Sequence, residues 1–81
     1  MLHSRKKRLE ELIKEEVAKI IDQMKDPRVR MVTVTEVSLS NDLRYATVYV
    51  SILERERVDE TMHALKRAQK FVRRELGSRI V

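Results

Sequence analysis

Basic side chains carry most of the chemistry that this sequence can perform. Residues 62–81 hold six lysines and arginines against one acidic residue, Glu75, and this surplus equals the net charge of +5 of the whole 81-residue chain. Lysine and arginine neutralise phosphates and release counterions, and arginine also donates paired hydrogen bonds to phosphates or base edges. A solvated, salt-bridged surface is the other explanation for a charged helix, but this segment nearly lacks the acidic partners that it needs. The candidate nucleic-acid contacts are Lys66, Arg67, Lys70, Arg73 and Arg74.

A second basic cluster lies near the N-terminus. Its four consecutive members are Arg5, Lys6, Lys7 and Arg8. Positive charges fit poorly at the start of a helix, because that end carries the positive pole of the helix dipole. The cluster is therefore either a second binding patch or a frayed, solvated helix end. Arg28 and Arg30 are further candidates, and Arg28 has an alternative role in bracing the turn after Pro27.

Catalytic and metal sites find little support in the residues. The single glycine, Gly77, cannot build the glycine-rich loop that cradles phosphates, and no serine stands in the setting of a nucleophile. Cysteine is absent, and His3 and His63 stand alone, without the ligand spacing of a structural zinc site. We assign His63 to the basic side of its helix. The sequence predicts a binding protein that is not an enzyme and that uses no cofactor or metal.

Composition indicates one small domain of the cytoplasm. A chain of this length forms one domain at most and buries about 60% of its unfolded surface. The lack of cysteine suits a reducing compartment. No apolar run approaches the roughly 20 residues of a membrane span, and no apolar stretch follows the N-terminal basic residues as it would in a secretory signal.

The elements that position these side chains begin with a helix over residues 4–25. Its apolar residues recur at steps of three and four and form one stripe, which is typical of a helix packed on a core. They are Leu9, Leu12, Ile13, Val17, Ile20, Ile21 and Met24. Asp26-Pro27 ends the helix, because the residue before proline is disfavoured in the helical region.

A β-hairpin is expected next, with strands over residues 31–39 and 44–52 and a turn centred on Asn41-Asp42. The expected cross-strand pairs are Val37–Ala46, Thr35–Val48 and Thr33–Val50. This register places one set of residues on the face that the helices cover: Met31, Val37, Ala46, Val48, Val50 and Ile52. The opposite face then carries Val32, Val34, Tyr45 and Tyr49.

A second helix is expected from Asp59, as its N-cap, to about residue 76, with Gly77 as its C-terminal cap. Its apolar side is expected to contain Met62, Leu65, Ala68, Val72 and Leu76, with Phe71 at the edge of the core. The basic residues fall on the other half. Aromatic residues could stack on unpaired bases, but there are only three, Tyr45, Tyr49 and Phe71, and a platform like that of the common four-stranded RNA-binding domains is not visible. Two strands make a marginal sheet, so we expect a third strand just beyond the end of this chain.

Three segments in this order resemble the signature of the ribosome-binding factor A family. The first is Lys25-Asp26-Pro27-Arg28, which ends the helix. The second is the Val- and Thr-rich strand from Val32 to Val37. The third is Ser40-Asn41-Asp42-Leu43, followed by Ala46-Thr47-Val48-Tyr49-Val50. Ala68, Phe71 and Arg73 also fit the family pattern, so the likeness covers essentially the whole chain.

The resemblance implies an α+β, type II KH-like domain with the order helix, strand, strand, a kinked pair of helices and a final strand that is missing here. Residues 1–81 are then a single KH-like RNA-binding domain that is truncated at its C-terminal end. It further implies a monomer that binds the small (30S) ribosomal subunit or its precursor and contacts 16S rRNA. Support of late maturation, including 5′-end processing, and importance at low temperature are also implied, without catalysis. Asp26, Pro27, Asp42 and Ala68 are assigned to the fold.

One departure from the family pattern concerns the kink. The family has an Ala-x-Gly element there, whereas this chain has Ala68-Gln69-Lys70. Either a milder kink or an unusual backbone geometry at Lys70 is expected. Two other classes of function stay open: a helix-turn-helix DNA-binding protein, and a protein-interaction module that uses the Tyr45/Tyr49 face.

Overall fold

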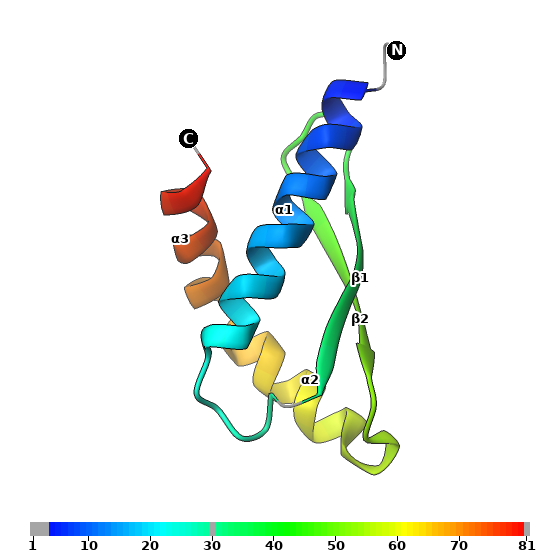
Figure 1. Cartoon of the computed structure of the whole chain (residues 1–81), viewed down its shortest axis with the longest axis vertical. Coiled ribbons are helices and arrows are strands. Elements are labelled where there is room, and N and C mark those ends of the chain that lie inside the picture. Colours follow the sequence, from blue (N-terminus) through cyan, green and yellow to red (C-terminus); the bar gives the residue numbers. More distant parts are fainter. Residues whose placement is uncertain (1–3, 30, 81) are drawn as a thin grey trace.

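The computed structural model describes residues 4–29 and 31–80 and shows helices packed on one face of a two-stranded antiparallel hairpin (Figure 1). The elements are α1 (Ser4–Gln23), β1 (Val32–Leu39), β2 (Ala46–Ile52), η1 (Arg55–Arg57), α2 (Val58–Arg67) and α3 (Gln69–Arg79). This order confirms the predicted α+β class with a helical pair after the hairpin. The helix α1 packs along β1, and α3 packs against α1.

The core lies between α1 and the inner face of the hairpin. From α1 it receives Ile13, Val17, Ile20 and Ile21, all under 8% exposed. The predicted stripe is thus largely confirmed, although Leu12 is 42% exposed because it falls at the outer edge of the stripe. The hairpin contributes Val34, Val37 and Leu39, and Val29 and Ala64 complete the cluster. A thin core of this kind gives each buried side chain a large share in holding the helices to the sheet.

The predicted strand register is wrong by two residues near the turn. Leu39 pairs with Ala46, and Val37 pairs with Val48. The predicted turn centred on Asn41-Asp42 is present, because the backbone N–H of Leu43 donates to the Ser40 carbonyl (2.9 Å). It lies inside a longer connection, residues 40–45, and this extra length shifts the register. The backbone N–H of Ser40 donates to the Tyr45 carbonyl (2.9 Å) and closes this loop. The side-chain hydrogen bonds of Asp42 stabilise the longer loop, and sequence spacing does not reveal them.

A bulge in β1 also changes which residues face the helices. The ladder is irregular between Val34 and Glu36, so Thr35 is the extra residue. Val34 and Val37 therefore both point inward although they are three residues apart. The predicted placement of Val32 and Val34 on the outer face is wrong, because Val34 is buried and Val32 packs against the core. Met31, predicted inside, is 56% exposed.

Three predictions about the second helix are also wrong. The helix α2 begins after the 3-10 turn η1 with Arg57 as its N-cap, so Asp59 lies inside the first turn. Gly77 lies within the last turn of α3, which continues to Arg79 and is capped by Ile80. Phe71, expected at the core, is 44% exposed, whereas Ala64 and Thr61 are buried. The bend between α2 and α3 rotates the apolar stripe, and a single helical wheel over residues 59–76 does not include that rotation.

The bend lies at Ala68, where φ is −82° and ψ is −2°. Its N–H reaches the carbonyls of both Ala64 (3.0 Å) and Leu65 (3.1 Å), and its own carbonyl accepts from Val72 (2.9 Å). Hydrogen bonding is thus continuous across the joint. Lys70 lies within α3, and among the described residues only Met31 and Leu43 are non-glycine residues with positive φ. A lysine is therefore accommodated in place of the family glycine without left-handed geometry.

Candidate RNA-binding surfaces

The basic helix surface consists of Lys66, Arg67, Lys70, Arg73 and Arg74. All five residues are exposed. They are held outward because the opposite side of α2 and α3 packs on the core through Ala64, Leu65, Val72 and Leu76. None of the five forms a salt bridge within residues 4–29 and 31–80. Their charges are therefore free to neutralise phosphates and release counterions on binding.

Arg79, the remaining basic residue of the C-terminal segment, has a different role. Its guanidinium lies 3.5 Å from Glu16 Oε1 and 3.6 Å from Glu75 Oε1, and it donates a 2.8 Å hydrogen bond to Gln23 Oε1. Arg79 thus links the end of α3 to α1. It stabilises the packing that presents the basic helix surface and is not available for a ligand.

Arg28 braces the turn after α1, the alternative that the sequence left open. Its Nε and Nη2 each donate to a different oxygen of Asp26 (both 3.1 Å), and its backbone N–H donates to Asp26 Oδ1 (2.9 Å). These hydrogen bonds from Arg28 hold the pKa of Asp26 below its ordinary value, and the charge of Arg67 acts in the same direction. The turn therefore lies within electrostatic reach of α2. The other candidate of this segment, Arg30, lies outside the described residues.

The N-terminal basic turn, residues 5–8, lies at the hairpin loop. Arg5, Lys7 and Arg8 are exposed, and Lys6 Nζ donates to Asn41 Oδ1 in the loop (3.2 Å). One turn further along α1, Glu10 accepts the backbone N–H of Leu39 (2.8 Å). Figure 1 places this turn and α2 at opposite ends of the long axis of the molecule. The two predicted basic patches are thus separate surfaces, and the loop adds a cation that sequence reasoning missed, the exposed Arg44.

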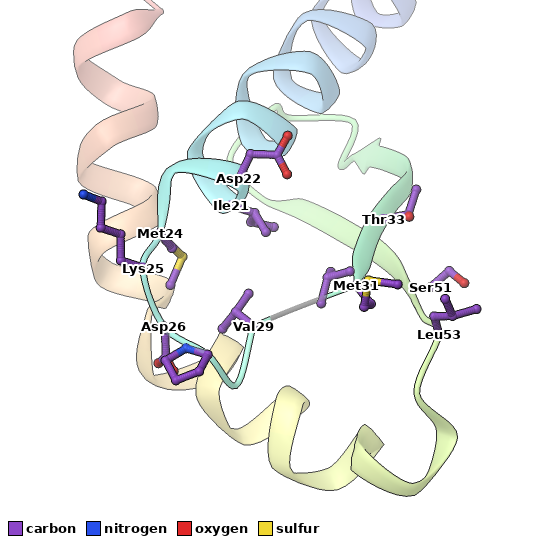
Figure 2. A pocket seen from close by; sticks show the side chains of 12 residues that line it. Ile21, Asp22, Met24, Lys25, Asp26, Val29, Met31, Thr33, Ser51 and Leu53 are labelled. Atoms are coloured by element: carbon purple, nitrogen blue, oxygen red, sulfur yellow. The ribbon is translucent and has the colours of Figure 1, made fainter.

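A cavity of about 750 Å³ lies between the end of α1, the following turn and the paired ends of the two strands (Figure 2). The exposed side chains of Met31 and Leu53 border it, and the backbone N–H of Leu53 donates to the Met31 carbonyl (3.2 Å). Asp22 and Asp26 add two carboxylates to the lining. A lining of apolar side chains and carboxylates is poorly suited to binding phosphate. None of the predicted contact residues lines the cavity.

Metal sites and membrane spans are not found among residues 4–29 and 31–80. No group of three or more histidine, cysteine, aspartate or glutamate side chains there is arranged to hold a metal ion. No helix in the same part of the chain is long and apolar enough to cross a membrane. The basic surfaces are the strongest candidate sites that the described residues offer.

Comparisons with known proteins agree with this geometry. The family model for ribosome-binding factor A matches residues 5–81. Ribosome-binding factor A of Desulfitobacterium hafniense (strain DSM 10664 / DCB-2) is 44% identical over 99% of this chain and 66% of its own length. That of Thermodesulfovibrio yellowstonii is 47% identical over 96% of this chain and 67% of its own length. The chain thus spans about two thirds of the length of these curated relatives.

A solved structure shares the fold. The crystal structure of ribosome-binding factor A from Thermus thermophilus superposes with a TM-score of 0.83 at 33% sequence identity. The match covers 90% of this chain and 79% of that one. Because the match includes nearly all of the described elements, the KH-like arrangement expected from the sequence is confirmed.

Proposed function

The chain belongs to the ribosome-binding factor A family, and we propose that it acts as a small-subunit assembly factor that binds 16S rRNA. In this proposal it is a non-catalytic, monomeric KH-like RNA-binding domain. It binds the small (30S) ribosomal subunit or its precursor and supports late rRNA maturation, including 5′-end processing. Its contribution is expected to be largest at low temperature.

The observation that carries this proposal is the basic helix surface. Its five cations are exposed, lie on both sides of the bend at Ala68 and form no salt bridge with any described residue. A phosphodiester backbone is the ligand that such a surface fits, because each phosphate contact releases condensed counterions. Lys70 adds a cation at the position where the family pattern has glycine. The N-terminal basic turn is proposed as a second contact, and Arg28 and Arg30 remain weaker proposals.

A helix-turn-helix mode of DNA binding is less well supported. That motif joins its two helices by a turn of three or four residues and sets them at about 90–120°. Here the single residue Ala68 separates α2 from α3, and hydrogen bonding continues across it. The arrangement favours a kinked helical pair that presents its outer side to RNA.

The test is co-sedimentation with small ribosomal subunits. Changing Lys66, Lys70, Arg73 and Arg74 together to Glu lowers the net charge by eight units and is expected to abolish co-sedimentation. A matched control variant has the same net charge but leaves the basic helix surface intact. In it, Glu replaces Lys19, Lys25, Arg55 and Arg57. It is expected to retain most binding. Equal co-sedimentation of the two variants would show that the site assignment is wrong, and failure of the wild type to co-sediment would contradict the proposed function.

A further inference from the structure

On the outer face of the hairpin, the side chains that the structure describes are exposed. Val48 and Val50 pack against the core, so the residues that alternate with them on β2 point away from the helices. Those alternate residues, and their neighbours on β1, are exposed. They are Thr33, Glu36, Thr47, Tyr49 and Ser51.

Two tyrosines stand on this open face. Tyr45 is 72% exposed and Tyr49 is 50% exposed. Tyr45 continues the ladder one step beyond β2, because its carbonyl accepts the Ser40 N–H. The two tyrosines are four positions apart in extended backbone, which places them about 13 Å apart on the same side of the sheet. Neither ring contributes to the core, so packing does not explain their presence.

The loop holds Tyr45 in a defined position. Its backbone N–H donates to Ser40 Oγ (3.1 Å), and Ser40 Oγ in turn donates to Asp42 Oδ1 (2.7 Å). The same carboxylate accepts the backbone N–H of Arg44 (3.1 Å). Leu43 adopts the left-handed region with φ of 61°, which these surrounding hydrogen bonds maintain. A ring presented by a braced loop loses little freedom on binding, which favours its use as a contact.

Positive charge borders the face at the loop end. Arg44 directly precedes Tyr45, and Lys6 brings the N-terminal basic turn to Asn41 in the same loop. Glu36 is the one acidic residue of the face. Aromatic rings beside cations are the combination with which proteins bind unpaired RNA, since the rings stack on bases and the cations neutralise the flanking phosphates.

We propose that this open face binds unpaired RNA, with bases stacked on Tyr45 and Tyr49 and the flanking phosphates held by Arg44 and the N-terminal basic turn. The inference deepens the proposed function and rests on it. It also uses the two tyrosines that the sequence placed on the face away from the helices. The rings are few, but both are exposed on one side of the hairpin.

The experiment compares two labelled RNAs with equal numbers of phosphates, an unstructured oligouridine and a blunt duplex, by fluorescence anisotropy. Tyr45→Ala is expected to weaken oligouridine binding about tenfold, because one base loses its stacking partner. Tyr49→Ala is expected to act in the same direction, and duplex binding is expected to stay unchanged. Tyr45→Phe, which keeps the ring, is expected to bind oligouridine within about twofold of the wild type.

Each other outcome has a definite meaning. If Tyr45→Ala and the wild type bind oligouridine equally, the stacking proposal is overturned, while the co-sedimentation test still decides the proposed function separately. If Tyr45→Ala reduces co-sedimentation with subunits but not oligouridine binding, the face contacts a protein and the proposal is likewise overturned. Far-UV circular dichroism checks that each variant is folded, and the exposure of both rings predicts no loss of structure.

Discussion

At the scale of single residues, carboxylates organise the backbone where regular structure ends. Asp26 accepts three hydrogen bonds from Arg28 in the turn after α1. Asp42 lies in the hairpin loop, where hydrogen bonds from Ser40 and from the Arg44 backbone lower its pKa. Glu10 accepts the Leu39 N–H and so ties α1 to the end of β1. These short contacts hold the turn after α1 and the hairpin loop in place.

The turn at Asp26 predicts a specific dependence of stability on pH. Because Arg28 holds the pKa of Asp26 below its ordinary 3.8, folding favours the ionised carboxylate. Its contribution to the free energy of unfolding is fully present above about pH 4 and is lost as the pH falls through the lowered pKa. Urea denaturation of the wild type and Asp26→Asn should therefore show a stability gap at neutral pH that closes below pH 3.8. A gap that persists or widens in acid would contradict this assignment.

At the scale of elements, the joint between α2 and α3 decides where the basic residues point. The bend at Ala68 needs no glycine, and α3 then continues regularly through Gly77 to Arg79. Arg79 links the end of α3 to Glu16 and Gln23 of α1. The helical pair is thus held at its C-terminal end, and its outer side stays free for phosphates.

Gly77 provides a direct test of this element. A Cβ built at residue 77 meets nothing within 4 Å, and Gly77 does not have positive φ. Gly77→Ala is therefore expected to raise the free energy of unfolding by about 0.5–1 kcal/mol, because alanine loses less conformational entropy inside a helix. Chemical denaturation measures the change. Destabilisation instead would indicate the left-handed C-terminal cap that the sequence predicted.

At the scale of the whole molecule, the cations form two surfaces along an axis of 41 Å rather than one continuous patch. The basic helix surface lies on α2 and α3, and the N-terminal basic turn lies at the hairpin loop. The two surfaces share no side chains, so their contributions to affinity should be nearly additive. In Figure 1, α3 rises alongside α1 from α2 toward the N-terminal end, so the basic helix surface extends along part of the long axis.

The salt dependence of RNA binding tests the N-terminal surface. Changing Arg5, Lys7 and Arg8 together to Ala is expected to reduce the slope of log affinity against log salt by about 0.7–0.9 for each phosphate that the protein no longer neutralises. The same reduction is expected when the basic helix surface already carries its four Glu substitutions, since the surfaces are separate. An unchanged slope in a titration with the subunit's RNA would show that this turn is only a solvated helix end.

Much of this protein follows from the sequence because the signals are local. The apolar stripe of α1, the stop at Asp26-Pro27, the Val- and Thr-rich strands and the excess of cations after residue 60 are all properties of neighbouring residues. They sufficed to predict the element order, the class of fold and the candidate basic residues. Propensity and periodicity act within a few residues, so a single chain displays them without any tertiary contact.

The tertiary structure decided what depends on contacts between distant segments. The register of the hairpin and the bulge at Thr35 depend on the packing of Val34 and Val37 under α1. The pairing of Arg79 with Glu16, 63 residues away, gives the sixth cation of the C-terminal segment a structural role. The burial of Val32 and Val34, which the sequence placed on the outer face with Tyr45 and Tyr49, depends on the same packing. Strand register, ion pairing between distant residues and burial depend on interactions summed over the whole folded chain. The local sequence around each residue therefore does not predict them.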